Sequence, residues 1–404
     1  MSGYIALPVT FAPLRYPMTE WPATTLSGVH FRLLDDPVDP PVRTSFGVMH
    51  SRATLLVRLT DEDGMQGFGE IWCNFPEGGA RYKATLMDRY VGPALRGQRF
   101  EQPEQVQAKL RSLFNVLRLQ CADHGAIAQL CAGVDQAAWD LFCKRKGEAF
   151  WQLLGGRPEI AVYASSIGPQ HVADTIRAQH AQGHTRFKIK LGFGDGIDEA
   201  NLQAALGALQ AEGELMVDVN QGWTLSQASR WLPHLSNAGV VWCEEPVPAD
   251  TPWNEWRELA VLASMTRLAA GENLLGMSLF VEAVEQGRIG VLQPDLGKWG
   301  GISDNLELAR RLPNAGAWIC PHWLSGGIGL MASLQYKAGI GGPGCVEMDI
   351  NPNRQRSEAL VGRMSVKAGA VTLSDAAGLI PPLSEWLLEP ERWQAAGVEV
   401  AHVA

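Results

Sequence analysis

Residues 186–191 read RFKIKL, residues 215–219 read LMVDV and residues 240–243 read VVWC, and this stretch decides the fold. Each run is short and almost continuously apolar, which is typical of a parallel strand buried on both faces. Comparable runs occupy residues 161–165, 268–270, 290–292, 317–320 and 345–348. Successive runs start about 22 to 30 residues apart, and helical patterns lie between several of them. Eight such units predict an α/β fold, a (β/α)8 barrel of the TIM type.

The structural alternative to a barrel is an open, doubly wound parallel sheet. Such a sheet usually carries a glycine-rich nucleotide loop directly after its first strand. The chain has no loop of that kind, so the pattern of short runs favours the barrel.

The first part of the chain follows an α+β pattern. Strand formers fill residues 53–59 and 67–72, and the turn signal DEDG at 61–64 lies between them. Apolar residues at helical spacing cover residues 101–119. Residues 74–82 are expected to form a loop, because proline and glycine are frequent there.

These patterns divide the chain into three segments. We predict that residues 1–130 form an α+β capping domain and that residues 131–354 form the barrel. A helix over residues 126–145 leads from the first segment into the second. Residues 355–404 lack the barrel rhythm, and we expect them to fold back and complete the capping domain.

Composition excludes several classes of protein. The chain has 404 residues, a net charge of −9 and a pI near 5.5, which argues against nucleic-acid binding. No window approaches the roughly 18 consecutive apolar residues of a membrane span, and the N-terminus lacks the pattern of a signal peptide. Seven widely spaced cysteines without a C-x-x-C motif are typical of a cytoplasmic protein.

Three consecutive predicted strands end in an acid, namely Asp218, Glu244 and Glu272. Strand ends converge in a closed barrel, where three unpaired anions would repel one another and take up protons. A cation resolves that repulsion, and all-oxygen ligation favours Mg²⁺, with Mn²⁺ as the alternative. Taken singly, each acid fits a solvated strand end or a helix N-cap better; three in register favour a metal site.

Basic residues end other predicted strands. Lys188 and Lys190 are two residues apart, so both side chains point to one face of their strand. Two neighbouring ammonium groups should depress one another's pKa, and a lysine with a lowered pKa can act as a general base. Asp295 and His322 end neighbouring strands, and a carboxylate beside a histidine fixes its tautomer and raises its basicity. His322 is therefore a second candidate acid/base, although a lone histidine after proline is more often structural.

In chain order these residues form the motifs K-x-K, D-x-N-Q-G-W, E-E-P, G-E-N, P-D-x-x-K-x-G-G and P-H. The ordered set resembles the enolase superfamily, and within it the mandelate racemase subgroup, over nearly the whole chain. The resemblance implies that Asp218, Glu244 and Glu272 bind Mg²⁺. It also implies that Lys190 is one acid/base and that Lys188 tunes it and helps to neutralise the enolate.

The resemblance assigns the remaining roles on the opposite side of the site. His322, paired with Asp295, would be the second acid/base. Glu347 would donate a hydrogen bond to the substrate carboxylate, with Asp349 as the alternate at the same strand end. Muconate-lactonizing and dipeptide-epimerising relatives usually carry a lysine where Asp295 stands, which disfavours those branches.

The reaction that the resemblance implies starts with removal of the proton α to a carboxylate. Mg²⁺ and Lys188 would stabilise the resulting enolate more than the bound substrate. The expected outcome is dehydration of a sugar acid or other hydroxy acid to a 2-keto acid. The alternative is racemisation or epimerisation of a 2-hydroxy acid, and a non-catalytic carboxylate-binding barrel is a remote third.

Specificity is expected to come from the capping domain, whose loops close over the barrel mouth in this family. By position, residues 16–25 and 74–82 are the candidate lids. The candidate substrate contacts at the barrel mouth and on these lids are Asn220, Lys298, Trp21, Trp72, Phe75, Arg81 and Tyr82. Loop packing explains the aromatic residues equally well. The family also implies a homo-oligomer that acts on a small hydroxy-carboxylate.

Overall fold

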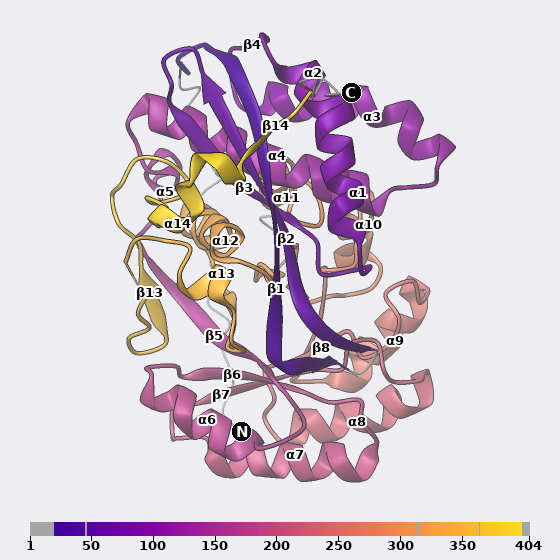
Figure 1. Cartoon of the computed structure of the whole chain (residues 1–404). Helices are drawn as coiled ribbons and strands as arrows, with labels where there is room; N and C mark the ends of the chain where they lie inside the picture. The colour runs from indigo at the N-terminus through magenta and orange to yellow at the C-terminus, as the bar shows by residue number, and fades with distance from the viewer. Residues whose placement is uncertain (1–19, 45–46, 313–315, 363, 398–404) are drawn as a thin grey trace.

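The computed structural model describes residues 20–44, 47–312, 316–362 and 364–397, and shows a barrel beside a capping domain (Figure 1). The cap sheet contains the antiparallel strands β1 (Thr24–Thr44), β2 (Gly47–Asp61) and β3 (Gln66–Trp72). Its order is β14-β1-β2-β3, and β4 (Arg99–Phe100) also pairs with β1. The C-terminal strand β14 (Gln394–Ala395) pairs with β1, so this part of the C-terminal segment lies against the first segment.

Eight parallel strands form the barrel, in the order β11-β10-β9-β8-β7-β6-β5-β12. They are β5 (Glu159–Ile167), β6 (Arg186–Lys190), β7 (Glu214–Asp218), β8 (Trp242–Glu244), β9 (Arg267–Ala270), β10 (Val291–Leu292), β11 (Trp318–Ile319) and β12 (Val346–Asp349). Each of the eight predicted runs thus forms or overlaps a strand. At the seam, the Glu347 N–H donates to the Pro321 carbonyl at 3.3 Å and joins the last strand to the chain after β11.

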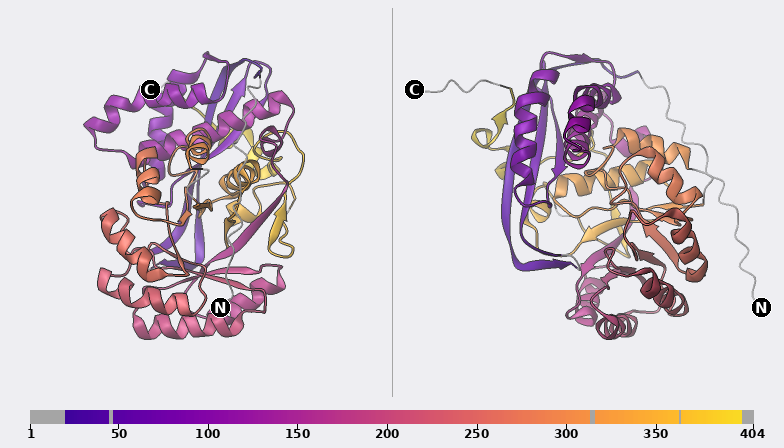
Figure 2. Two further views of the ribbon diagram at one scale, coloured as in Figure 1. Left: turned by 180° about the vertical axis from the view of Figure 1, so that it is seen from behind. Right: turned by 90° about the vertical axis from the view of Figure 1, so that its right-hand side faces the viewer.

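Helices connect successive barrel strands. They are α6 (Val172–Ala181), α7 (Asp195–Ala208), α8 (Leu225–Asn237), α9 (Trp253–Ala263), α10 (Met277–Glu285), α11 (Ser303–Arg311) and α12 (Gly327–Ile340). Figure 2 shows these helices outside the barrel strands, with the cap sheet along one side of the molecule. No helix in the described ranges is long and apolar enough to cross a membrane.

The cap helices are α1 (Gly79–Leu86), the π-helical turn η1 (Met87–Val91), α2 (Gly92–Leu95), α3 (Glu104–Gln120), α4 (Gly125–Lys146) and α5 (Phe150–Leu153). The predicted helices over 101–119 and 126–145 correspond to α3 and α4. The C-terminal segment adds α13 (Arg354–Ser357), β13 (Ala370–Thr372), α14 (Glu385–Leu388) and the 3₁₀ turn η2 (Pro390–Arg392).

Alternation along the barrel strands separates two layers of side chains. In β7, Leu215 and Val217 pack with the surrounding helices, whereas Met216 joins the barrel interior. That interior layer consists of Tyr163, Met216, Trp242, Ala269, Val291, Cys320 and Cys345. The next inward-facing residue of β7 is Asp218, so a polar layer lies directly above the apolar one.

The structure corrects the sequence reading of the cap in two places. The sequence does not predict β1, because Asp35, Asp36 and Pro37 interrupt any strand pattern. Helix α1 begins at Gly79, so the second half of the loop expected at 74–82 is helical. Of the lid expected at 16–25, residues 16–19 lie outside the described residues and 24–25 belong to β1.

Helix α4 crosses the cap sheet at very close range. A Cβ atom added to Gly69 of β3 would lie 2.0 Å from the carbonyl oxygen of Gly133 in α4. Real Cβ atoms do not approach backbone so closely, so the helix would have to move. Glycine at this position is therefore a condition of the contact between α4 and β3.

We expect the Gly69→Ala substitution to lower the free energy of unfolding by about 1–3 kcal/mol, the usual cost of overpacking. Thermal or urea unfolding measures this loss. The control is Gly207→Ala in α7, where a Cβ meets nothing within 4 Å and alanine favours the helix. An unchanged stability of Gly69→Ala would contradict the close contact.

Candidate active site

Lys188 of β6 lies at the centre of the polar layer. Its Nζ is 2.6 Å from Glu244 Oε2, 2.8 Å from Glu347 Oε1 and 3.8 Å from Asp218 Oδ2. The side chain is only 1% exposed, so the three carboxylates replace water around the ammonium group. Lys188 thereby connects β6 with β7, β8 and β12.

Lys190 is held at one end of this cluster. Its Nζ lies 2.6 Å from Asp218 Oδ2 and 2.7 Å from Asn220 Oδ1. The backbone N–H of Asn220 donates to Asp218 Oδ1 at 2.8 Å, which fixes the carboxylate in place. Asn220 adopts a left-handed conformation with φ of 46°, where asparagine is better tolerated than most residues.

His322 occupies the other end of the cluster. Its Nδ1 lies 2.6 Å from Asp295 Oδ2, and its Nε2 lies 2.9 Å from Glu272 Oε2 and 3.6 Å from Glu347 Oε2. Lys298 Nζ approaches the same Glu272 oxygen at 3.0 Å and lies 4.8 Å from the ring centre of Trp72. Trp72 is the last residue of β3, so the cap covers this end of the cluster.

We call these residues the charged network. Its members are Lys188, Lys190, Asp218, Glu244, Glu272, Asp295, Lys298, His322 and Glu347. Ion pairs no longer than 3.8 Å connect all of them without a break. Each member is a candidate site residue predicted from the sequence, and the structure brings all of them together at the carboxyl ends of the barrel strands.

The pKa of each lysine shifts in the direction opposite to the expected one. Burial lowers the pKa of Lys188, but Glu244 and Glu347 raise it well above the usual value. Burial also lowers the pKa of Lys190, but Asp218 outweighs it and the net pKa is raised. The expectation considered only the lysine pair, whereas the carboxylates beside each ammonium group contribute more.

The pKa shifts of the two glutamates and of His322 differ in direction, because their charged neighbours differ. Burial would raise the pKa of Glu272, but Lys298 and His322 bring it well below the usual value. Burial and the neighbouring Asp218 raise the pKa of Glu244 to about 7. Burial lowers the pKa of His322, but Glu272 and Glu347 raise it well above its usual value. In this arrangement His322 carries a proton at neutral pH and is a potential acid.

Glu347, not Asp349, belongs to the charged network. Burial raises the pKa of Glu347, but Lys188 and His322 bring it below its usual value, so it accepts hydrogen bonds and is ionised. This differs from the protonated donor that the resemblance implies. Asp349 instead contacts Arg52 of β2 at 2.7 Å and Arg356 of α13 at 2.9 Å. It therefore joins the barrel to the cap and the C-terminal segment.

The three acids expected to bind metal offer the oxygen donors that Mg²⁺ prefers and end neighbouring strands. Asp218 and Glu244 are direct neighbours in the register of β7 and β8, and Glu272 lies close enough to raise the pKa of Glu244. Within the described residues, however, no three His, Cys, Asp or Glu side chains are grouped as metal ligands. Each of the three carboxylates turns instead toward a lysine or His322.

The candidate contacts from the cap differ in their positions. Phe75 lies beside Trp72, with ring centres 6.1 Å apart. Trp21 packs on Trp139 and Phe142 of α4. Arg81 and Tyr82 are exposed on α1, where the Tyr82 hydroxyl donates to Asp123. The structure therefore brings Trp72 to the charged network, with Phe75 beside it, whereas Trp21 and Tyr82 make these contacts elsewhere in the cap.

The sequence analysis did not assign two polar residues that contact the network. Ser165 Oγ donates to Glu347, and Gln293 Nε2 donates to Glu244. Each lies at the end of a predicted apolar run, so the rule that found the acids could also have found them. Both orient carboxylates that face Lys188.

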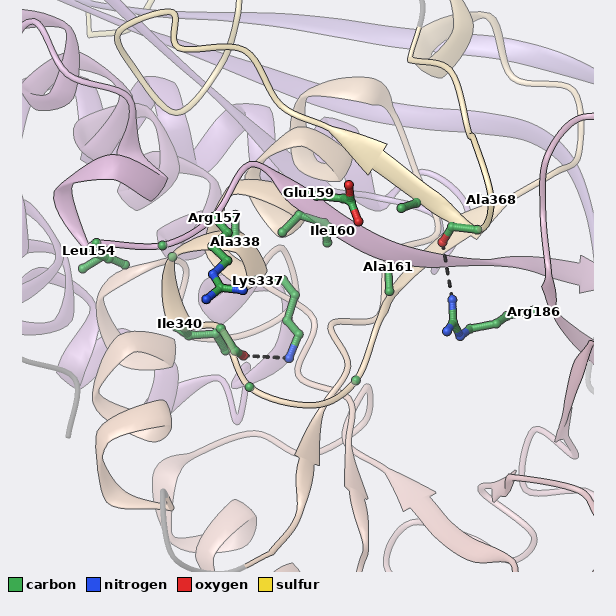
Figure 3. A pocket seen from close by; sticks show the side chains of 18 residues that line it. Leu154, Arg157, Glu159, Ile160, Ala161, Arg186, Lys337, Ala338, Ile340 and Ala368 are labelled. Atoms are coloured by element: carbon green, nitrogen blue, oxygen red, sulfur yellow. Dashed lines mark hydrogen bonds between the residues drawn. The ribbon is translucent and has the colours of Figure 1, made fainter. Parts of the chain in front are cut away.

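A different cavity, of about 990 Å³, lies at the opposite end of the barrel (Figure 3). Arg157, Glu159 and Arg186 line it near the starts of β5 and β6, together with Lys337 at the end of α12. Lys337 Nζ donates to the carbonyls of Gly341 and Pro343, which stabilises the loop before β12. None of its described lining residues belongs to the charged network. Residues at this end of a barrel usually serve stability.

The chain belongs to the enolase superfamily, in its mandelate racemase subgroup. Residues 171–379 match the enolase C-terminal domain-like model, and residues 29–155 match the mandelate racemase/muconate lactonizing enzyme N-terminal domain. This explains why a cap of two chain segments covers a barrel with polar strand ends.

Three known proteins are similar to this chain over most of its length. D-galactarolactone cycloisomerase from Agrobacterium fabrum is 30% identical over 372 residues, covering 88% of this chain and 95% of the relative. The structure of a mandelate racemase/muconate lactonizing enzyme from Bordetella bronchiseptica is 39% identical, with a TM-score of 0.82 and coverage of 89% and 98%. An enolase from Bradyrhizobium, complexed with magnesium and mandelic acid, is 26% identical, with a TM-score of 0.78 and coverage of 92% and 98%.

The different roles of Asp349 and Glu347 can be tested by stability. Asp349→Asn leaves two buried or half-buried guanidinium groups without their carboxylate, and we expect it to cost about 3–5 kcal/mol of unfolding free energy. Glu347→Gln should cost less, because Lys188 keeps Glu244 and Asp218. Urea unfolding at pH 7 measures both, and a larger loss for Glu347→Gln would contradict these assignments.

Acid should remove the contribution of Asp349. Burial raises its pKa, but Arg356 and Arg52 lower the net value from 3.8 to about 2. A lowered carboxyl pKa stabilises the fold above the unfolded pKa, and this stabilisation is lost as pH falls through the folded pKa. We expect the stability difference between wild type and Asp349→Asn to shrink between about pH 4 and pH 2. A pH-independent difference would contradict the ion pairs.

Proposed function

We propose that the protein removes the proton α to the carboxylate of a small hydroxy acid in an Mg²⁺-dependent reaction. We further propose that it dehydrates a sugar acid or related hydroxy acid to a 2-keto acid. One observation carries this proposal: the charged network holds Lys190 and His322 at opposite ends of the row formed by Asp218, Glu244 and Glu272. A substrate carboxylate at this row would have an acid/base group on either side of its α-carbon.

Asp218, Glu244 and Glu272 would hold the Mg²⁺ ion. When bound, the ion would supply positive charge to the substrate carboxylate. It would also offset the negative charge of the acids, which raises the pKa of Lys190 and His322. The Bradyrhizobium relative complexed with magnesium and mandelic acid supports the choice of ion. Lys188, only 1% exposed, keeps a fixed ammonium charge beside the same row.

In the proposed reaction, Lys190 accepts a proton from the substrate and His322 donates one to it. Neutral Lys190 takes the α-proton on Nζ, and the electron pair of the broken C–H bond delocalises onto the substrate carboxylate. Lys188 stabilises the negative charge of this enolate, because its position is fixed before the reaction begins. His322 donates its Nε2 proton to the β-hydroxyl oxygen, the C–O bond breaks and water leaves. The enol product then takes up a proton at C3, loses the proton of its C2 hydroxyl group and becomes the 2-keto acid.

Two other outcomes start from the same enolate. If His322 returns a proton to the α-carbon from the opposite side, the product is the epimer, and the opposed positions of His322 and Lys190 favour this alternative. The relative that is 30% identical, a D-galactarolactone cycloisomerase, favours a second candidate, cycloisomerisation of a sugar-acid lactone. All three outcomes require the same acid and base.

Exchange of the α-proton tests the common step. With Mg²⁺ in deuterated water, we expect the wild type to incorporate deuterium at the α-carbon of at least one acid from a panel of aldonates, aldarates, their lactones and mandelate. Lys190→Met and His322→Asn should each lower turnover by about 100-fold or more, because general acid–base catalysis contributes at this level. NMR and mass spectrometry measure the exchange. Tight binding of an acid without any exchange would favour a binding protein.

The product distinguishes the three outcomes. Dehydration gives a semicarbazide-reactive 2-keto acid that has lost the mass of one water. Cycloisomerisation of a lactone gives an isomer of unchanged mass, and racemisation gives inverted configuration without a keto product. Inverted acid alone would overturn the dehydratase proposal but leave the enolate step in place.

Metal binding can be tested without turnover. We expect Mg²⁺ to raise the melting temperature of the wild type, since a ligand that binds only the folded state stabilises it. Removal with EDTA should reverse the shift. Asp218→Asn and Glu272→Gln should abolish it, whereas the exposed acid variant Glu214→Gln should retain it. An equal shift in all variants would contradict the proposed ligands.

A further inference from the structure

The loops that carry Asp295 and His322 are each anchored to the cap just before a helix. Asp295 lies in the loop between β10 and α11, and His322 lies in the loop between β11 and α12. The two loops also bind each other, since the His322 N–H donates to the Pro294 carbonyl at 3.2 Å. Their placement therefore fixes the acid/base pair as a unit.

Glu70 of cap strand β3 anchors the loop of His322. Its two carboxylate oxygens accept the N–H groups of Gly326 at 2.6 Å and Gly329 at 2.9 Å, at the start of α12. Glu70 is fully buried, so these amides have no water to bind instead. The Gly326 carbonyl in turn accepts the indole N–H of Trp323 at 2.7 Å. Trp323 directly follows His322, so the anchor is connected to the acid/base residue.

Asp135 of cap helix α4 anchors the loop of Asp295. Its Oδ2 accepts the N–H groups of Ile302 at 2.7 Å and Ser303 at 2.9 Å, where α11 begins. Its Oδ1 accepts the Ser303 hydroxyl at 2.6 Å. A Cβ on Gly301 would lie 2.4 Å from Asp135 Oδ2, so the loop backbone fits tightly against the carboxylate.

Gln136, the next residue of α4, connects both anchors. Its amide nitrogen donates to the carbonyl of Leu296, the residue after Asp295, at 2.9 Å. Its amide oxygen accepts the backbone N–H of Glu70 at 3.2 Å. All three side chains are fully buried, and β3, α4, α11 and α12 lie together in the fold (Figure 1).

We propose that Glu70, Asp135 and Gln136 are positioning residues through which the cap sets the geometry of the Asp295–His322 pair. The opposite acid/base, Lys190, is oriented by Asp218 and Asn220, which belong to the barrel. Loosening the cap anchors should therefore slow proton transfer at His322 more than proton transfer at Lys190. A cap that only excluded water would affect the two sides alike. The catalytic part of this inference rests on the proposed α-proton abstraction.

The matched control lies on the same helix. Asp140 of α4 is also fully buried and accepts backbone N–H groups, but from Phe68 of the cap and from Leu379 and Ile380 of the C-terminal segment. Asp140→Asn therefore disturbs a buried carboxylate that accepts backbone N–H groups, together with its ion pair to Lys144, without touching the two loops. Asp135→Asn and Glu70→Gln disturb the anchors of the acid/base pair.

Side-specific exchange is the catalytic test. The probes are the two enantiomers of mandelate and the C2 epimers gluconate and mannonate, each incubated with Mg²⁺ in deuterated water. Lys190→Met and His322→Asn identify which isomer reports on which base. We expect Asp135→Asn and Glu70→Gln to slow exchange at His322 by on the order of ten- to 100-fold, a typical effect of small misplacement. Exchange at Lys190 should stay within about threefold, because barrel residues orient that lysine.

Amide hydrogen exchange tests the anchors without any substrate. Residues 296–303 and 322–330 should exchange faster in Asp135→Asn and Glu70→Gln than in wild type, and Asp140→Asn should leave both segments protected. Equal protection in all four proteins, or equal slowing of both proton transfers in Asp135→Asn and Asp140→Asn, would overturn the positioning role. If no acid of the wider panel of aldonates, aldarates, lactones and mandelate exchanges its α-proton in the wild type, the proposed function fails, whereas the amide measurement still decides whether the cap fixes these loops.

Discussion

The buried acids and bases of the charged network offset one another's charge at the carboxyl ends of the barrel strands, and the arrangement of this end depends on that balance. Five carboxylates face three lysines and one histidine, and burying any of them alone would cost several kcal/mol. Each side chain therefore takes the position in which its neighbours offset its charge. The pKa of each acid reflects both burial and partners. Lys298 and His322 outweigh burial and bring the pKa of Glu272 well below its usual value, whereas burial and Asp218 outweigh Lys188 and raise the pKa of Glu244 to about 7.

The cap contributes more than a cover to this arrangement. Its sheet brings Trp72 over Lys298, and Arg52 to Asp349. Its buried carboxylates bind the backbone at the starts of two barrel helices, where N–H groups lack partners within the helix. Because these bonds lie in the interior, movement of the cap would leave polar groups unsatisfied on both sides. Buried hydrogen bonds thus join the cap to the loops that follow Asp295 and His322.

The sequence predicted the barrel and the charged network well, and the cap less well. Strand ends converge in any closed barrel, so regular spacing was enough to bring Asp218, Glu244 and Glu272 to one place. The pKa directions of Lys188 and Lys190 were wrong, because they depend on which carboxylate each lysine meets. Strand β1 was not predicted, because its pairing with β2, β4 and β14 stabilises it, and the residues of β1 alone do not show a strand pattern throughout. The contacts of Glu70 and Asp135 cross between distant segments, which no local pattern reveals.

The seam of the barrel, where β11 meets β12, is closed by a backbone hydrogen bond to Pro321 and by side chains of the charged network. β11 and β12 lie at the two ends of the hydrogen-bonded strand order, and the Glu347 amide bonds to Pro321 between them. Across this junction, the Glu347 side chain reaches His322 on one side and Lys188 on the other. A side chain of the charged network therefore also connects the two strands that close the barrel. A substitution at Glu347 would therefore alter the closure of the barrel together with the contacts of the charged network.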